Sequence, residues 1–300
     1  WNASRFGLLN LQDYEECPRG ELRMEDRWIL SRYEKTVQEV TDALEKFDLG
    51  EGARLLYEFI WNEFCDWYIE LAKGRLYDKE HPEARHTVQS ILTEVLEGTM
   101  RLLHPYMPFI TEEIWQNLPG AEESIMIQSW PQAKGYADPE AEKEMSLIMD
   151  TIKAIRNIRA EMNVQPGRKA EIILVASEEE SRKTLEKGEM SIKNLAGGSS
   201  LDIYEKLESK PPQAASAVLG EVEVYLPLRG LLDLDKEIAR VEKEIAQANK
   251  ERARLEGKLS NQGFVSKAPA EVVAKEREKL EGVNARIEAL QIRLAELKEI

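Results

Sequence analysis

Cysteine and histidine are scarce in this chain of 300 residues, which has 2 cysteines and 3 histidines. Neither the cysteines, Cys17 and Cys65, nor the histidines fall into a CxxC, HxxxH or HExxH spacing. Because zinc sites draw their ligands from such closely spaced residues, the sequence predicts no metal site. Two cysteines also make no disulfide framework, so a reducing cytoplasm is the expected compartment.

Long apolar runs are missing as well. No segment approaches the roughly 18 to 20 apolar residues of a membrane helix, and no charged-then-apolar leader opens the chain. We therefore expect no membrane partner. The chain begins at Trp1 and not at methionine, which indicates a piece of a larger protein.

Signatures of catalysis are also absent. No nucleophile can be paired with a neighbouring base, and Gly197-Gly198-Ser199 lacks the lysine of a phosphate-binding P-loop. Acidic pairs such as Glu112-Glu113 are typical of solvated helix surfaces. The sequence thus predicts no catalytic residue and no cofactor, and recognition remains as the function.

Positive charge is in deficit, but unevenly along the chain. The formal net charge is -15. Residues 231–300 hold 14 basic and 14 acidic residues, which leaves 27 of the 41 basic and 42 of the 56 acidic residues in 1–230. Binding to a nucleic-acid phosphate backbone needs local positive potential, and the overall negative charge disfavours it. The net negative charge, however, lies entirely in residues 1–230, and residues 231–300 are neutral overall.

Helical spacing of apolar residues dominates the first 160 positions, which also hold all six tryptophans. Trp61, Phe64 and Tyr68 share one helical face and are expected in a core. The spacing predicts a helical bundle over residues 1–164. Its helices are predicted over about 25–47, 52–77, 83–103, 110–118 and 139–162.

Residues 165–230 change to strand-like alternation after Pro166-Gly167. Strands are predicted over 170–175, 201–204 and 217–226, with a helix over 178–195, which makes a small α/β connector. From Leu231 to the end, heptads replace this pattern and predict an antiparallel coiled-coil arm. The fold class is therefore mainly α.

The heptads also predict how the arm pairs. A turn near Gly263-Phe264 makes the numbers of paired residues sum to 528, which sets Arg252 opposite Glu276 and predicts a monomeric hairpin. Core positions in the first arm helix are Leu234, Ile238, Val241, Ile245, Ala248, Arg252, Leu255 and Leu259. In the second they are Val273, Glu276, Leu280, Val283, Ile287, Leu290, Leu294 and Leu297.

Several segments carry a family resemblance. They are WNASRF at 1–6, DRWILSR at 26–32, WNEFCDWYIE at 61–70 and HPYMPFITEEIW at 104–115. They resemble the anticodon-binding bundle of the class I aminoacyl-tRNA synthetases for valine, isoleucine and leucine. AIRNIRA at 154–160 and the stretch 257–273 resemble the bacterial valyl-tRNA synthetases in particular.

The resemblance implies a tRNA-binding role. The bundle would bind the anticodon of valine tRNAs and the arm would grip the tRNA elbow. The parent would be an ATP-dependent valine–tRNA ligase whose catalytic and editing domains lie upstream in the same polypeptide, so this segment should not aminoacylate.

Candidate contacts in the bundle combine arginines, which hold phosphates, with aromatic rings, which stack on unpaired bases. The resemblance supports this surface as the anticodon site. The alternative is a purely structural role, in which Phe6 and Trp28 are core residues and the arginines form surface ion pairs. The predicted tRNA-binding residues are Asn2, Arg5, Phe6, Arg27, Trp28, Arg32, Arg156 and Arg159.

Candidate contacts in the arm lie on the outward face of its first helix, where acids are lacking. The alternative to RNA binding is a charged helix face that only contacts solvent. These residues are Lys236, Arg240, Lys243, Lys250 and Arg254.

Two alternative functions stay open on the sequence. One is a coiled-coil scaffold or dimerisation protein with a partner-binding bundle. The other is the same region of a leucyl or isoleucyl enzyme, although an isoleucyl enzyme would be expected to end in a cysteine-bearing zinc module, and no cysteine follows Cys65.

Overall fold

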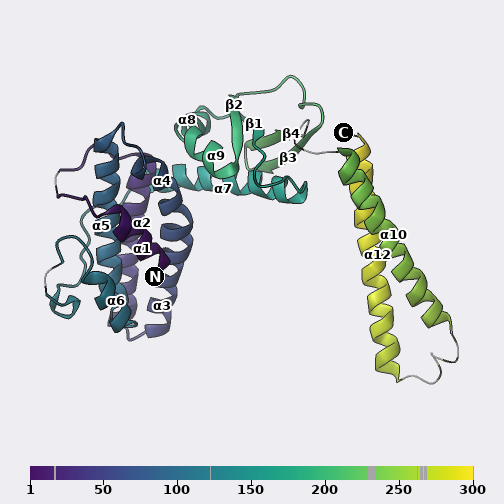
Figure 1. Cartoon of the computed structure of the whole chain (residues 1–300), viewed down its shortest axis with the longest axis horizontal. Helices are drawn as coiled ribbons and strands as arrows, with labels where there is room; N and C mark the ends of the chain where they lie inside the picture. The colour runs from purple at the N-terminus through teal and green to yellow at the C-terminus, as the bar shows by residue number, and fades with distance from the viewer. Residues whose placement is uncertain are drawn as a thin grey trace. The chain divides into compact units, whose positions relative to one another are not determined.

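The structure is a computed structural model of the whole chain (Figure 1). It describes residues 1–16, 18–121, 123–228, 231, 234–261, 263, 266 and 269–299, without the side chains of 234–237, 293 and 296–299. The fold is mainly α with one small sheet, as predicted. The chain divides into two compact units, one of residues 1–152 with 183–195 and the other of 153–182 with 196–300. Within the described residues, no helix is long and apolar enough to span a membrane.

The first unit is a helical bundle whose helix starts follow from local sequence. Pro82 and Pro108 each open a helix, where a missing N–H costs nothing, and the Asp48 carboxylate caps a third by accepting from the Glu51 amide at 3.0 Å. The elements are α1 (Asn2–Asn10), α2 (Met24–Glu45), α3 (Leu49–Glu58), η1 (Phe59–Tyr68), α4 (Ile69–Leu76), α5 (Pro82–Leu103), α6 (Pro108–Trp115), η2 (Ile125–Ile127) and the first part of α7 (Pro139–Glu161). α1 was not among the predicted helices.

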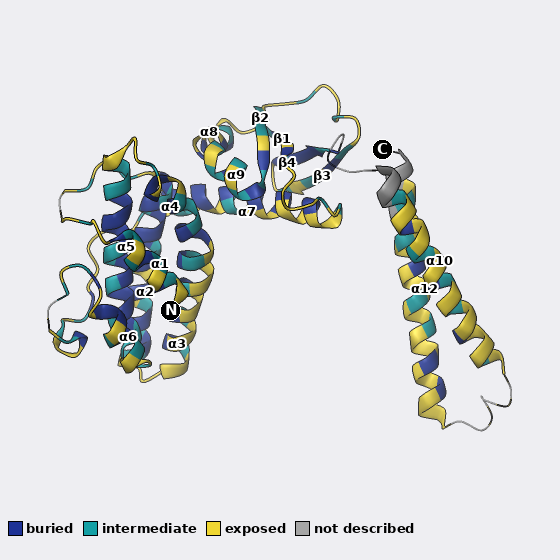
Figure 2. Ribbon diagram, viewed as in Figure 1, coloured by how far each residue is buried: buried dark blue, intermediate teal, exposed yellow. Residues whose placement is uncertain are grey.

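The bundle core is built largely from the apolar faces of α2 and α5, and Figure 2 shows buried residues along both helices. Ion pairs also link α2 to the first turns of α7, from Arg27 to Glu144 and from Arg32 to Glu142. The largest contributors from α2 are Trp28, Ile29, Leu30, Tyr33, Val37 and Val40, and those from α5 are Val88, Ile91, Leu92 and Val95. Met145, Ile148 and Ile152 of α7 are buried as well.

A π-helical stretch, η1, interrupts the predicted second helix and changes which residues face the core. A π-helix takes more residues per turn than an α-helix, so the buried face here runs through Phe59, Phe64 and Tyr68, whose rings follow one another at 6.5 and 6.3 Å. Trp61 is 56% exposed, and Trp67 is buried. The expectation of a buried Trp61 is therefore wrong, because it assumed a continuous α-helical period.

The connector holds a four-stranded sheet in the order β2-β1-β4-β3. β1 and β2 are parallel, and the predicted strand at 217–226 is instead part of an antiparallel hairpin that turns at Gly220, with φ +58°. The predicted helix at 178–195 is also two helices. The elements are β1 (Ala170–Ala176), α8 (Glu179–Lys187), α9 (Glu189–Ala196), β2 (Gly198–Tyr204), β3 (Ala214–Leu219) and β4 (Val222–Pro227).

The arm consists of α10 (Leu234–Ser260) and α12 (Ala270–Glu299), which pack against each other and diverge somewhat toward the segment that connects them (Figure 1). The predicted heptads are confirmed. Among the described side chains of residues 270–295 in α12, only those at predicted core positions are buried or half-buried, and the buried ones described in α10 are Val241, Ala248 and Leu255. The residues predicted to close the tip, Phe264 and Val265, lie outside the described residues.

Arg252 and Glu276 form no ion pair with each other in this structure, and the register predicted for them stays a prediction. Arg252 pairs with Glu256 of its own helix at 3.8 Å, and Glu276 instead accepts from Lys258 across the seam and from Lys279, both at 3.1 Å. Heptads fix which face is buried, but a shift by one heptad keeps that face, so the charged contacts decide the register.

Candidate nucleic-acid interface

Helix α1 presents the first group of predicted contacts on the bundle surface. Asn2 and Arg5 are exposed, and the side chain of Arg5 makes no hydrogen bond or ion pair within the described part of the chain. Phe6 is half-buried, and the Lys73 ammonium lies 5.8 Å from the centre of its ring, which is a cation–π distance. The helix thus offers a free guanidinium beside a ring that already attracts positive charge.

A cavity of about 600 Å³ lies beside α1, within the size range of ligand pockets. Its walls are mainly apolar and come from α1, η1, α4, α5 and α6. The Thr99 hydroxyl in one wall is buried and has no hydrogen-bond partner. Polar lining residues include Asn2, Asp66, Glu70 and Lys73; apolar ones include Phe6, Trp61, Phe64 and Met107. An apolar slot with a few polar groups suits a flat aromatic ligand that also forms hydrogen bonds.

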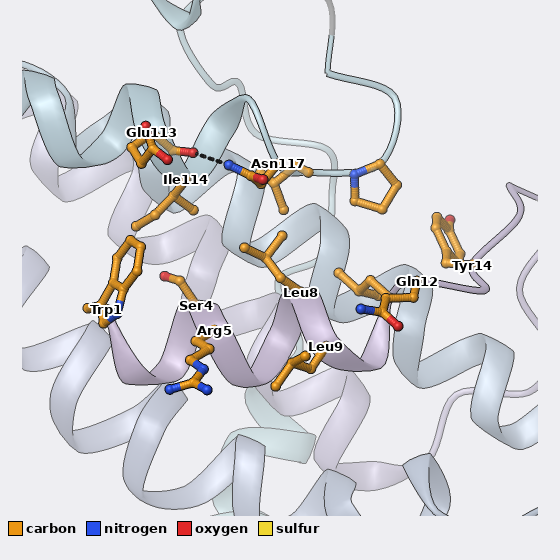
Figure 3. Close-up of a pocket in the computed structure, with 13 residues that line it drawn as sticks. Trp1, Ser4, Arg5, Leu8, Leu9, Gln12, Tyr14, Glu113, Ile114 and Asn117 are labelled. Atoms are coloured by element: carbon orange, nitrogen blue, oxygen red, sulfur yellow. Dashed lines mark hydrogen bonds between the residues drawn. The ribbon is translucent and has the colours of Figure 1, made fainter.

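A second cavity, of about 510 Å³, lies between α1 and α6. In Figure 3, Leu8 occupies its centre, Trp1 and Ile114 close one end, and Tyr14 stands at the other. Trp1 lines both cavities, so α1 separates two neighbouring hollows.

Tyr57 and Trp61 form an exposed aromatic pair that sequence reasoning missed. Their ring centres are 6.0 Å apart with planes inclined by only 6°, and the side chains are 61% and 56% exposed. Two large rings stacked in solvent make a platform for a nucleobase. The i, i+4 spacing was visible in the sequence, but the π-helix that turns Trp61 outward was not.

Three predicted contacts on α2 hold the bundle together in this structure. Trp28 is only 2% exposed, so its ring packs in the core and offers no stacking face. Arg27 donates to Asp138 and Glu144 at 3.1 and 3.3 Å. Arg32 donates to both carboxylate oxygens of Glu63 at 2.8 and 2.9 Å and also to Glu142 at 3.1 Å.

The predicted basic edge on α7 does not form. Arg156 is exposed, but Arg159 is buried and donates to the backbone carbonyls of Gly197 and Arg168 at 3.3 and 2.7 Å. Burial lowers the pKa of Arg159. Its guanidinium also packs against Gly197, whose φ of +70° favours glycine, so Arg159 links the end of α7 to the segments that precede β1 and β2.

The outward face of α10 carries the predicted arm contacts. Lys243, Lys250 and Arg254 are exposed and have no ion pair within the described residues, whereas Arg240 pairs with Glu244. The side chain of Lys236 lies outside the described residues. Between Ala239 and Gly257 this face holds only small residues, a glutamine and cations, with no acid to neutralise them. No cluster of three potential metal ligands occurs in the part of the chain that the structure describes.

Comparison with known proteins identifies both parts of the chain. Residues 26–174 match the anticodon-binding domain of tRNA ligases, and residues 233–298 match the valyl tRNA synthetase tRNA binding arm. The chain is 47% identical over 302 aligned residues to the valine–tRNA ligase of Carboxydothermus hydrogenoformans, and 45% and 44% identical to those of Geobacillus stearothermophilus and Bacillus subtilis. Each alignment covers 99% of this chain and 34% of the relative, so the chain spans about a third of the length of the curated relatives it matches.

A helical bundle and a coiled-coil arm with these two matches define the RNA-binding region of an aminoacyl-tRNA synthetase. Within that class, the chain belongs to the valine–tRNA ligase family and corresponds to the C-terminal part of its members. The resemblance drawn from the sequence motifs is confirmed.

Proposed function

We propose that the chain binds valine tRNAs for a full-length, ATP-dependent valine–tRNA ligase. The bundle binds the anticodon loop and the arm binds a second region, the tRNA elbow. Amino-acid activation and transfer belong to the upstream residues of the same polypeptide, which the relatives possess beyond the matched third. The 300 residues themselves need no cofactor and catalyse no step, and the protein acts in the cytoplasm as a monomer.

The cavity beside α1 is the observation that carries this proposal. Unpaired bases are read by stacking on aromatic rings and by hydrogen bonds to their edges. Phe6 and the Tyr57–Trp61 platform supply rings, and the exposed Asn2 side chain supplies a hydrogen-bonding group at the wall. Arg5 lines the neighbouring cavity between α1 and α6, where its guanidinium is exposed and can meet a phosphate.

The α10 face supports a second point of attachment. A row of unpaired cations on a rigid helix suits the phosphate backbone, and an acid-free surface is uncommon on a chain of net charge -15. The hairpin also supports a monomer, because α10 finds its partner helix within its own chain.

Filter binding with three transcripts tests the function. Valine tRNA, the same tRNA with an altered anticodon, and an unrelated tRNA are titrated at two salt concentrations. We expect the first to bind best at both concentrations and all three to weaken as salt rises. Equal affinity for the three transcripts would overturn anticodon recognition, and a concentration-dependent dimer in light scattering would favour the scaffold alternative.

A further inference from the structure

Gln247 is the one long polar side chain without charge on the outward face of α10. From Ala239 to Gly257 this face otherwise consists of small residues and cations. Gln247 is exposed, and its side chain makes no hydrogen bond within the described residues. The face therefore offers a single free amide in a row of positive charge.

The amide of Gln247 stays free although an acid lies within reach along the helix. Gln38, an exposed glutamine of α2, donates to Asp42 four residues ahead at 3.0 Å. Gln247 has Glu251 at the same spacing but makes no such bond in the part of the chain that the structure describes. Its donor and acceptor atoms are thus available to a ligand.

Free cations surround Gln247 on the helix surface. Lys243 lies four residues before it and Lys250 three residues after it, so both are its immediate neighbours on an α-helix. Arg254 follows two turns beyond it on the same side. All three are exposed without an ion pair among the described residues, and lysine and arginine hold RNA by its phosphates. A bound strand would therefore be fixed on both sides of the Gln247 amide.

Short side chains beside Gln247 let a strand approach the helix closely. Ala246 and Ala253 are exposed on the same outward face, and this face carries no acid between Ala239 and Gly257. Nothing bulky or negatively charged on it therefore holds a strand away. A strand whose phosphates contact Lys243 and Lys250 would bring its sugars and bases within reach of the glutamine.

An amide can distinguish what the cations cannot. Every nucleotide presents the same phosphate, so contacts from lysine and arginine position a strand without reading its sequence. Glutamine carries a donor and an acceptor side by side, as base edges do, whereas an ionised phosphate offers acceptors only. In RNA, sequence is read mainly at unpaired nucleotides, whose edges are accessible. The position of Gln247 therefore suits the edge of an unpaired base.

We propose that Gln247 is a specificity-determining residue of the arm, which hydrogen-bonds the edge of an unpaired tRNA base while the neighbouring cations hold the phosphates of the same strand. This role rests on the proposed function, since it takes the α10 face as a tRNA contact. It adds base recognition to a surface whose other long side chains act through charge.

Filter binding with abasic tRNAs tests this role of Gln247. Valine tRNA is compared with versions that lack one base each, at successive unpaired positions of the elbow, but keep the sugar and the phosphate. We expect one abasic position to weaken binding by the unmodified 300-residue chain by roughly five- to tenfold, as the loss of one or two hydrogen bonds would. Gln247→Ala should weaken binding of intact valine tRNA by a similar factor and should show no further loss at that position.

The salt dependence separates a base contact from a phosphate contact. Gln247→Ala removes no charge, so the slope of log affinity against log salt should stay unchanged. Gln247→Lys should recover affinity at low salt and steepen the slope by about 0.7 to 0.9, the value for one added phosphate contact, but it should stay insensitive to the abasic position. Gln291→Ala is the matched control, because this exposed glutamine lies on α12 outside the cationic face and its loss should leave binding unchanged.

Two results would overturn the role of Gln247. Unchanged affinity of Gln247→Ala would make the amide a solvated surface group, and an equal loss on intact and on every abasic tRNA would make it a backbone contact. Failure of the proposed function looks different, because reversal of Lys243, Lys250 and Arg254 to glutamate would then also leave binding unchanged. If that reversal weakens binding while Gln247→Ala does not, only the role of Gln247 is rejected.

Discussion

Arg75 donates to both carboxylate oxygens of Asp26, at 2.6 Å each, and the two side chains are 7% and 0% exposed. Asp26 also accepts from the Tyr68 hydroxyl and from the Arg23 amide, both at 3.0 Å. One buried carboxylate therefore ties the start of α2 to η1 and α4. η1 and α4 also form part of the wall of the cavity beside α1, so the Arg75–Asp26 pair supports the site indirectly.

Replacing Asp26 by asparagine is expected to lower the free energy of unfolding by about 3 kcal/mol, because it leaves Arg75 buried without its main counter-charge. Glu25, which lies 3.0 Å from Arg75, compensates only in part. Urea denaturation followed by circular dichroism measures the effect. Glu58→Gln, which removes an exposed partner of Arg54, is the control and should change stability little. Similar stability of both variants would contradict the role given to Asp26.

Glu94 predicts an acid-sensitive component of stability. Burial alone would raise its pKa, but hydrogen bonds from Lys134 and Arg19 outweigh burial and lower the pKa below the usual 4.5. A carboxylate with a lowered folded-state pKa stabilises the fold above its unfolded pKa, and this contribution is lost as the pH falls through the folded value. Stability of the native chain should therefore fall more steeply below about pH 4.5 than that of Glu94→Gln.

Thermal midpoints of the two proteins across this pH range provide the measurement. Glu113→Gln, which changes an exposed carboxylate of α6 that has no ion pair in the described structure, is the control. Its profile should follow that of the unmodified chain. Parallel profiles for Glu94→Gln and the unmodified chain would show that the Glu94 contacts do not form.

Arg5 and Arg32 were predicted alike from sequence but should behave differently. Arg5 is exposed without a partner, whereas Arg32 is held by Glu63 and Glu142. Arg5→Ala should weaken valine tRNA binding several-fold and leave the thermal midpoint unchanged. Arg32→Ala should lower the midpoint because it leaves Glu63 and Glu142 facing each other. Filter binding and thermal denaturation of both variants separate the roles, and a lower midpoint for Arg5→Ala would contradict the assignment.

The sequence predicted what depends on repetition. Apolar spacing located α2, α5 and α7, and the heptads located the core positions of α12 from Val273 to Leu294. It did not reveal structure that depends on a single local departure from the regular helical period. Trp61 was placed in the core because no pattern signals the π-helix, and Trp28 was placed at a site because an aromatic residue looks the same in sequence whether it packs or stacks.

The sequence also could not predict which partners the arginine side chains find in the folded chain. Arg32 and Arg159 have partners more than 30 positions away in Glu63 and Gly197, and only folding brings them together. Arg5, which the same reasoning chose, has no such partner. The predicted surface at α1 therefore keeps its support from the structure, while α2 and the edge of α7 lose theirs.

Reversal of the α10 cations tests the arm. Lys243, Lys250 and Arg254 changed together to glutamate should weaken tRNA binding and reduce the slope of log affinity against log salt by roughly 2 to 3, since each phosphate contact contributes about 0.7 to 0.9. The helix content should stay unchanged, because these side chains face solvent. The same reversal at the exposed Lys79, Lys206 and Lys210 gives an equal change in net charge and should leave the slope nearly intact. Equal effects of both triple variants would show that the α10 cations act only through the net charge of the protein and would contradict a specific tRNA contact on this face.

The register of the arm can be settled in solution by the Lys258–Glu276 contact. Glu276 is 8% exposed within the seam, and hydrogen bonds from Lys279 and Lys258 lower its pKa. A double-mutant cycle between Lys258→Glu and Glu276→Lys should therefore give a coupling energy of about 0.5 to 1 kcal/mol, with the double variant more stable than the two single changes predict. The cycle between Arg252→Glu and Glu276→Lys is the matched control and should show no coupling, since Arg252 meets Glu256 instead. Thermal melting of the arm supplies the four stabilities in each cycle. Coupling in the second cycle and none in the first would contradict the ion pairs of this structure and would favour a direct contact between Arg252 and Glu276.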